Sequence, residues 1–214
     1  ELLEDNLFDM AYAWDGHHLL NKLAKGEENA LAFDTYIDSV KVKYEPNDIL
    51  MNFVTNHDEN SWNGTIKERM GDLGLAMTTL TYAAPGMPLI YSGQEYGLDK
   101  RLLFFEKDSF PKVKGDMWTL LEKLAKVKQH NSALNGGKSP SSYEQILPES
   151  KTVLAFKRYT KSDEVIYMVN LGNTSENINL SNSNSYKDVI TGRLYKDLKT
   201  IELSPKTYML LEKQ

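Results

Sequence analysis

The sequence predicts an α/β region followed by an all-β region. Up to residue 138, short apolar runs alternate with longer stretches that have helical periodicity, which indicates a parallel sheet with crossover helices. From residue 139 onward, short alternating segments are separated by Gly, Asn, Ser and Pro, a pattern typical of an antiparallel β-sandwich. The turn-rich stretch 135–140 lies between the two patterns. We therefore expect one domain over 1–138 and a second over 139–214.

Three apolar runs predict the strands of the first region, at 7–14, 49–55 and 87–91. The run at 49–55 is nearly continuous, as in a strand that is buried on both faces. The run at 7–14 alternates, and a period of two gives its aromatic and apolar side chains one shared face. These side chains are Phe8, Met10, Tyr12 and Trp14.

Four stretches predict the helices of the first region. The first begins at Asp15, a plausible N-cap, and the others cover 33–40, 68–84 and 117–134. Pro85 and Gly86 end the third stretch. A closed (β/α)8 barrel takes about 250 residues. These elements therefore correspond either to about three units of such a barrel or to a small open α/β sheet.

Six segments of the second region alternate apolar and polar residues over lengths typical of strands. We expect strands at 153–159, 164–170, 178–180, 187–190, 200–203 and 206–211.

Composition excludes several classes of function. The 214 residues include 25 basic and 30 acidic side chains, for a formal net charge of -5, which argues against a nucleic-acid-binding protein. The longest apolar run, 87–91, is far shorter than the roughly 18 residues of a membrane span. The absence of cysteine excludes disulfides, thiolate metal sites and cysteine nucleophiles. The chain begins with Glu1 rather than with an initiator methionine, and residues 1–6 lack the features of a signal peptide, so we expect a piece of a longer protein.

Polar residues follow two of the predicted strands, where a β/α architecture places catalytic side chains. Asn56, His57 and Asp58 follow the strand at 49–55, and they suit hydrogen bonding to a polar substrate or simply form a loop. Gln94 and Glu95 follow the strand at 87–91. Glu95 could be catalytic or could brace its own loop.

Other polar and aromatic residues have a structural interpretation. We expect His17 and His18 to be surface residues at a helix start, and His130 to complement a helix C-terminus. Tyr12 and Trp14 would line the mouth of a cleft or pack inside a barrel layer. Four basic residues are expected to be solvated charges: Lys67, Arg69, Lys100 and Arg101.

Segments 53–58 (Phe-Val-Thr-Asn-His-Asp) and 85–95 (Pro-Gly-Met-Pro-Leu-Ile-Tyr-Ser-Gly-Gln-Glu) resemble the α-amylase family of glycoside hydrolases. Segment 8–14 looks like the sixth barrel strand of that family. Four further segments look like its C-terminal β-sandwich: 156–158, 165–171, 188–192 and 203–205. The resemblance covers essentially the whole chain. It implies the C-terminal portion of a (β/α)8 TIM barrel, followed by an antiparallel β-sandwich.

The resemblance also implies roles for the first strand-end motif. Asp58 would be the third acidic residue of the subsite at which the bond is cleaved, where it grips sugar hydroxyls and favours an oxocarbenium-like transition state. His57 and Asn56 would bind sugar beside it. Apart from the resemblance, the aromatic residue Trp62 in the following loop would stack on a sugar ring or anchor the loop.

The second strand-end motif is implied to support the site rather than to perform chemistry. It comprises Tyr91, Gln94 and Glu95. Ser92 stands where the family usually has Tyr or Asn, a departure that affects no catalytic assignment.

Retaining hydrolysis requires a nucleophile and an acid/base carboxylate about 5–5.5 Å apart. In the family these lie on strands four and five, upstream of the first strand seen here, and neither Glu1 nor Glu4 follows an apolar strand. The sequence is thus interpreted as a fragment, inactive alone, of a retaining enzyme that acts on α-glucosidic bonds of starch-like glucans or maltooligosaccharides. The alternative is a non-catalytic carbohydrate-binding or interaction protein with an amylase-like fold. An open α/β hydrolase-like domain would need a nucleophile that the sequence does not offer.

Expectations for ligands follow from the same resemblance. The partner would be an α-glucan or maltooligosaccharide, with no nucleic acid and no membrane. No metal site is assigned here, although calcium is possible in the full-length protein through upstream residues. Open barrel edges favour self-association. The compartment is not fixed, and an extracytoplasmic location suits a starch-degrading enzyme.

Overall fold

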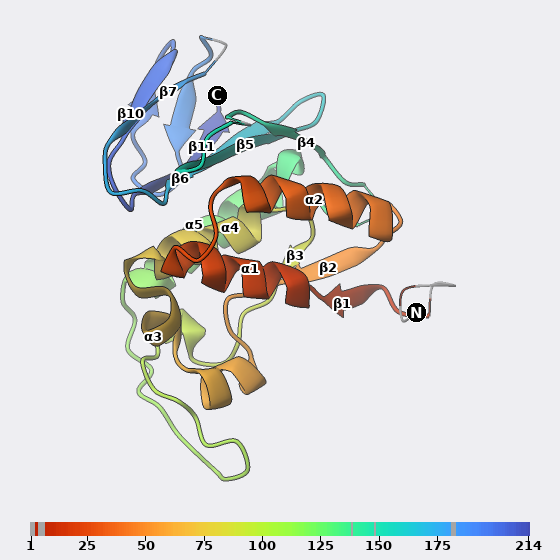
Figure 1. Ribbon diagram of the computed structural model, residues 1–214, viewed down its shortest axis with the longest axis vertical. Helices are drawn as coiled ribbons and strands as arrows, with labels where there is room; N and C mark the ends of the chain where they lie inside the picture. Colours follow the sequence, from red (N-terminus) through yellow and green to blue (C-terminus); the bar gives the residue numbers. More distant parts are fainter. Residues whose placement is uncertain (1–2, 4–6, 138, 148, 181–182) are drawn as a thin grey trace.

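The computed structural model describes residues 3, 7–137, 139–147, 149–180 and 183–214. A short parallel sheet, a layer of helices and an antiparallel β-sandwich follow one another in space, with the sandwich and the parallel sheet on opposite sides of the helices (Figure 1). The predicted fold class, α/β followed by all-β, is confirmed. Residue 138, at the predicted domain boundary, lies outside the described residues, and the two domain ranges stay a prediction.

The parallel sheet has the order β1-β2-β3. It contains β1 (Met10–Tyr12), β2 (Ile49–Asn52) and β3 (Met87–Pro88), all shorter than the predicted runs. The apolar run is longer than β2. Phe53 and Val54 are fully buried but lie beyond the end of the strand. Buried apolar residues thus continue after the strand ends.

The helical layer begins one residue earlier than predicted. Helix α1 (Trp14–Lys25) starts at Trp14, so this residue does not share a strand face with Tyr12. Its N-cap is Ala13 without a side-chain bond, and Asp15 lies in the first turn. The strand assignment of Trp14 and the N-cap assignment of Asp15 were therefore wrong. Helix α2 (Leu31–Lys43) confirms the stretch at 33–40.

The stretch at 68–84 is not one helix. It contains α3 (Ile66–Met70), a 3-10 turn (Gly71–Leu73) and α4 (Gly74–Ala83). The break falls at Gly71, whose φ of 51° is a conformation that glycine adopts without steric cost. The last helix, α5 (Asp116–His130), is followed by a separate 3-10 turn over Ser132–Leu134.

The sandwich consists of a six-stranded sheet of order β4-β5-β6-β11-β8-β9 and a two-stranded sheet of β7 and β10, with antiparallel pairing throughout. The strands are β4 (Ser142–Gln145), β5 (Val153–Tyr159), β6 (Glu164–Asn170), β7 (Glu176–Asn179), β8 (Tyr186–Asp188), β9 (Leu194–Tyr195), β10 (Thr200–Leu203) and β11 (Tyr208–Lys213). The predicted bounds of β5, β6 and β10 are confirmed. Strands β4 and β9 were not predicted.

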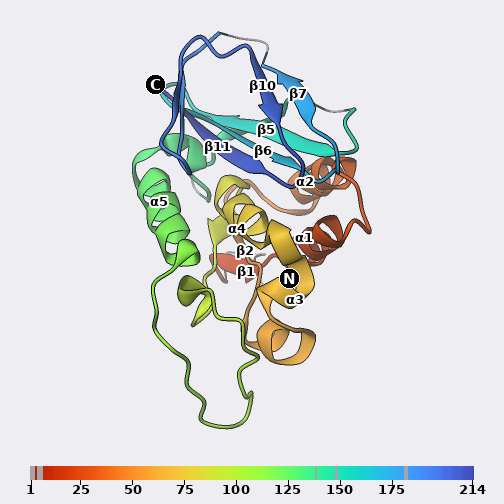
Figure 2. The ribbon, with the colours of Figure 1, turned by 90° about the vertical axis from the view of Figure 1, so that its left-hand side faces the viewer.

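The six-stranded sheet is apolar on both faces. One face packs with the two-stranded sheet, through residues such as Ile166, Met168 and Ile201. The other face packs against the helices, and Figure 2 shows the sheet lying across α4 with α5 at one side. The helices therefore share one hydrophobic core with the sandwich.

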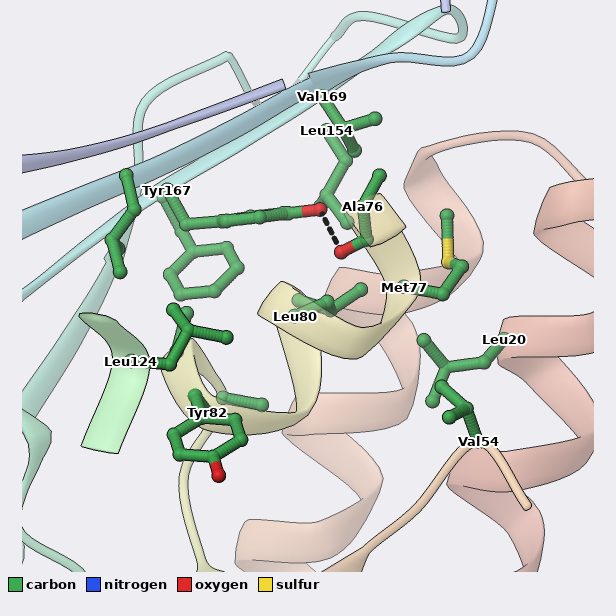
Figure 3. Packing of buried hydrophobic residues seen from close by; sticks show 14 of the residues in the cluster. Leu20, Val54, Ala76, Met77, Leu80, Tyr82, Leu124, Leu154, Tyr167 and Val169 are labelled. Carbon is green, nitrogen blue, oxygen red and sulfur yellow. Dashed lines mark hydrogen bonds between the residues drawn. The ribbon is translucent and has the colours of Figure 1, made fainter. Parts of the chain in front are cut away.

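Two buried polar side chains of the sandwich bind helix α4 directly. The Tyr167 hydroxyl donates to the Ala76 carbonyl at 2.9 Å, in the middle of that core (Figure 3). The Arg158 guanidinium donates to the carbonyls of Ala83 and Ala84 at the C-terminus of α4. The unpaired carbonyls of a helix end carry partial negative charge, which compensates a buried cation.

Candidate active site

The first strand-end motif forms a turn, residues 56–58, which we call the Asp58 turn. Asn56 is buried, and its Oδ1 accepts a hydrogen bond from the Glu59 amide at 2.8 Å. His57 is exposed and Asp58 is half-buried, with 54% and 42% of their side-chain surface accessible. His57 Nε2 lies 3.6 Å from Asp58 Oδ2. The turn thus presents an imidazole and a carboxylate to solvent, at the carboxyl end of β2.

Three buried polar atoms beside the two strand ends have no hydrogen-bond partner within the described part of the chain. They are Thr55 Oγ1, Asn56 Nδ2 and Gln94 Nε2. A buried polar atom left unpaired costs about 1–3 kcal/mol. The structure places Asn56 below the surface, and its predicted contact with sugar stays a prediction.

The second strand-end motif follows β3. It lies beside the first because the Leu89 amide donates to the Asn52 carbonyl at 2.8 Å. Gln94 Oε1 accepts from the Tyr91 amide at 3.3 Å, and Glu95 Oε2 accepts from the amide of Gly93 at 2.8 Å. Both side chains hold the backbone of their own turn, an arrangement in keeping with a supporting role. Burial raises the pKa of the Tyr91 hydroxyl.

Three exposed aromatic rings lie next to the Asp58 turn. We call Trp62, Phe104 and Phe105 the aromatic platform. Phe104 lies between the others, with ring centroids 5.2 Å from Trp62 and 4.8 Å from Phe105. The His57 ring stacks on Phe104 at 5.9 Å. Trp62 is 56% exposed, so it does not anchor its loop by burial.

Phe104 and Phe105 were not predicted as site residues. The available signal was the run of four consecutive apolar residues at 102–105 inside the loop 97–115, which is rich in charged residues. This loop projects from the end of the molecule opposite the sandwich (Figures 1 and 2). An exposed apolar run in such a loop indicates a contact surface.

Hydrogen bonds fix the long loop to the helical turn that carries Trp62. The Asn60 side chain donates to the Lys100 carbonyl at 3.1 Å and accepts from the Leu102 amide at 2.8 Å. The Ser61 hydroxyl donates to the carbonyl of Leu102 at 2.8 Å. The aromatic platform is therefore held together by polar contacts beneath it.

His17 was expected at the surface, and that prediction was wrong: the residue is 1% exposed. Because α1 begins at Trp14, His17 turns toward the strand end and its ring stacks on Phe53, with centroids 4.4 Å apart. Its Nε2 lies 3.0 Å from Glu59 Oε2. Burial lowers the pKa of His17, and the bond to Glu59 partly offsets this effect. His18, by contrast, is exposed as predicted.

Arg69 was expected to be a solvated charge, and this too was wrong. It is 7% exposed and donates to the carbonyls of Val54 and Gly64 at 2.7 and 3.0 Å. Its Nη1 donates to Asn21 at 2.7 Å. Burial lowers the pKa of Arg69, and the negative charge of Glu59 opposes this effect. The sequence shows only that Arg69 lies on a helix, not what packs above it.

The remaining basic candidates form exposed ion pairs. The bond from His130 to Glu212, at 2.7 Å, raises the pKa of that imidazole. Lys67, Lys100 and Arg101 each pair with a nearby carboxylate: Asp99, Asp108 and Glu68 respectively. No group of three or more histidine or carboxylate side chains among the described residues is placed to hold a metal ion, and no described helix is long and apolar enough to cross a bilayer.

The arrangement can bind a polyhydroxylated ring. Aromatic faces pack against the apolar faces of a sugar, while a carboxylate accepts hydrogen bonds from its hydroxyls. Three carboxylates of the described chain lie near the strand ends. Asp58 and Glu95 are both partly exposed, and Asp58 lies beside the exposed His57 rather than beside a buried group. Glu59 is bound to His17, and Glu95 is bound to its own turn.

The chain is similar to α-amylases in both sequence and structure. It is 22% identical over 188 residues to the α-amylase MalA of Haloarcula japonica, a match that covers 87% of this chain and 28% of MalA. The maltogenic α-amylase AmyB of Thermotoga neapolitana matches with a TM-score of 0.78 at 19% identity, over 96% of this chain and 51% of AmyB.

The structure of AmyP in complex with maltose matches with a TM-score of 0.72 at 14% identity, over 96% of this chain and 50% of AmyP. No family model matches the sequence. The chain spans about half the length of these solved structures and less than a third of the curated relative. It therefore has the fold of the C-terminal part of an α-amylase, and the resemblance seen in its strand-end motifs extends over nearly its whole length.

Proposed function

We propose that this chain is part of a retaining glycoside hydrolase that acts on α-glucosidic bonds of starch-like glucans or maltooligosaccharides. The observation that carries this proposal is the solvent-accessible pair of Asp58 and His57, which lies at the carboxyl end of a parallel strand and beside the aromatic platform. The α-amylase fold and the maltose complex of AmyP support it.

In this proposal Asp58 binds sugar hydroxyls in the subsite where the bond is cleaved. Its negative charge stabilises the positive charge that develops on the sugar ring in the transition state. His57 hydrogen-bonds the same sugar, and the platform stacks on a neighbouring ring. The nucleophile and the acid/base are carboxylates outside this chain, so we expect the 214 residues alone to bind glucan without hydrolysing it.

The binding half of the proposal is tested by titrating the isotopically labelled chain with maltotriose and following amide signals by NMR. We expect saturable shifts at His57 and Asp58 and at the Trp62 indole. Cellotriose, which has β-linkages, should produce none of them. Shifts spread over the sandwich instead of these residues would contradict the proposal.

Two variants sharpen the binding test. Trp62→Ala should weaken maltotriose binding about five-fold, because a stacked ring contributes about 1 kcal/mol. Asp58→Asn should weaken it about ten-fold or more through loss of a charged hydrogen-bond acceptor. Tyr195→Ala removes a ring from β9 in the sandwich and serves as the control, with affinity unchanged.

The catalytic half is tested by extending the reading frame upstream of Glu1. A strand that ends in Asp and a later strand that ends in Glu would supply the missing pair, and the longer protein should then cleave maltooligosaccharides. Asp58→Asn in that protein should lower kcat/KM by about 10²–10³-fold.

A non-catalytic carbohydrate-binding protein is the second candidate, and the aromatic platform favours it because stacking needs no catalytic carboxylates. Maltotriose binding by the chain, combined with the absence of a carboxylate pair upstream, would select this candidate. The two functions therefore differ in hydrolysis and not in binding.

A partner for the parallel sheet is also proposed. Strands β1 and β3 are its outer strands, and the apolar side chains of Leu7, Phe8 and Met10 are exposed beside β1. We expect these edges to pair with another copy of the chain or with the rest of a barrel. A purely monomeric sedimentation profile at micromolar concentration would contradict self-association.

A further inference from the structure

A buried imidazole lies beneath the Asp58 turn and contacts the chain on both sides of it. His17 Nδ1 is 3.1 Å from the Phe53 carbonyl, which precedes the turn. His17 Nε2 is 3.0 Å from Glu59 Oε2, which follows the turn directly. The ring therefore bridges the two ends of the segment that carries Asp58.

A buried guanidinium repeats this arrangement. Arg69 Nη2 donates to the Val54 carbonyl, before the turn, and Arg69 Nε donates to the Gly64 carbonyl, after it. Arg69 Nη1 is also 4.0 Å from Glu59 Oε2. Both ends of the turn are thus fixed twice, from two different helices.

The two contacts of His17 are made together only in one protonation state. The Phe53 carbonyl and the Glu59 carboxylate only accept hydrogen bonds, so both are satisfied only when the imidazole carries both protons. When His17 is neutral with its proton on Nδ1, Nε2 becomes an acceptor, and Asn21 Nδ2, at 3.1 Å, is placed to donate to it. Glu59 then still accepts the hydrogen bond that Asn63 donates to its Oε1 at 3.0 Å.

The charged and titratable groups around His17 come from three elements. Glu59 faces it from the helical turn after Asp58, and Arg69 faces it from α3. His18, on the same helix α1, has its ring centroid 5.7 Å away. Glu68 acts at one remove, through its charge on Arg69. Among these groups, the carboxylate of Glu59 is the one that holds the protonated form of His17 in place.

We propose that His17 and Arg69 are positioning residues that clamp the Asp58 turn, and that protonation of His17 switches the clamp between two bonded states. In the acid state His17 binds both Phe53 and Glu59. As pH rises, the bond from His17 to Glu59 is released, and of the two clamping side chains only Arg69 still holds the end of the turn that follows Asp58. Because burial lowers the pKa of His17, the switch lies below the 6.5 of an ordinary histidine.

The test follows the imidazole signals of His17 and the backbone amides of Asp58 and Glu59 by NMR between about pH 4.5 and pH 8, a range that brackets the pKa of histidine. We expect all three to share one titration midpoint, below 6.5. The measurement is repeated in a His57→Gln background, which removes the neighbouring exposed imidazole. His17→Gln should abolish the shared titration, while His130→Gln, which removes an exposed histidine paired with Glu212, should leave it intact.

Glu59→Gln provides a second route if His17→Gln does not fold. Loss of the facing carboxylate should lower the His17 midpoint by about one pH unit, and the Asp58 amide should move with it. Arg69→Lys should retain the titration but broaden the Asp58 amide, because lysine cannot reproduce two separate guanidinium bonds. An Asp58 amide that ignores the His17 midpoint in every variant would overturn the inference.

This inference rests on the proposed function only for the consequence that sugar affinity follows the same midpoint. If maltotriose does not bind at any pH while the Asp58 amide still titrates with His17, the proposed function fails and the clamp stands. If maltotriose binds with an affinity that is constant over the same pH range, the clamp fails and the proposed function stands.

Discussion

The hydroxyl of Tyr167 offers a direct measure of how firmly the sandwich is attached to the helices. It is fully buried and donates to the carbonyl of Ala76 in α4 (Figure 3). Tyr167→Phe removes this bond and keeps the ring. The Ala76 carbonyl also accepts within its own helix, so it is not left unpaired. We therefore expect the cost of one neutral hydrogen bond, about 1 kcal/mol in the free energy of unfolding.

Urea unfolding, followed by far-ultraviolet circular dichroism and by tryptophan fluorescence, measures this cost. The three tryptophans lie in the first 118 residues, so fluorescence reports the helical part while circular dichroism reports the whole chain. Tyr167→Phe should lower both midpoints together and lower the Tm by about 2–4 °C. Tyr159→Phe, on the neighbouring strand, is the control.

Two results would refute the reasoning about Tyr167. One is an unchanged free energy of unfolding, which would show that the bond contributes nothing net. The other is a shift in circular dichroism without a shift in fluorescence, which would show that the sandwich unfolds separately and that the shared core does not couple the two parts.

Three further predictions follow from the structure. Gly86→Ala should lower the free energy of unfolding by more than about 1 kcal/mol, because the φ of Gly86 is 110° and an added Cβ would lie 2.3 Å from a backbone oxygen. Gly115→Ala is the control: its Cβ would meet no atom within 4 Å, so the free energy of unfolding measured in urea should not change. Asp108→Ala should speed proteolysis of loop 97–115. Lowering the pH should have the same effect on the unsubstituted chain. The ammonium and two amides bound to Asp108 lower its pKa to about 2, so their support is present above its ordinary pKa and is lost as pH falls toward 2. His130→Gln should remove the small stabilisation that the bond to Glu212 provides. This stabilisation is present in acid and is lost as pH rises through the raised pKa of His130, so the Tm difference between the variant and the unsubstituted chain should vanish at high pH.

Local patterns predicted the sandwich better than the parallel sheet. Strands 153–159 and 164–170 pair with each other across a short connection, so their alternation and their turn residues specify both ends. In the parallel sheet, the apolar run 49–55 reflects burial rather than pairing, and the ladder ends at Asn52. The break at Gly71 was missed because the helical period of apolar residues continues across it.

The candidate site was predicted only where its residues are local in sequence. Asp58 and Tyr91 follow strands, which the hydrophobic pattern locates. The burial of His17 depends on Phe53, 36 residues away, and on Glu59. A single sequence carries no signal for such a contact, and a charged or imidazole side chain is by default expected in solvent. The assignments of the site residues themselves stay predictions.

The apolar face of the six-stranded sheet limits how this chain can be divided into separate domains. Its face toward the helices includes Leu154, Phe156 and Tyr167, all of which would meet water in an isolated sandwich. A transplanted sandwich would therefore need a replacement cover of matching shape, or it would aggregate through that face. The change of sequence pattern near residue 138 marks where one architecture gives way to another. We do not expect the protein to be divisible there, because the helices and the sandwich share this core.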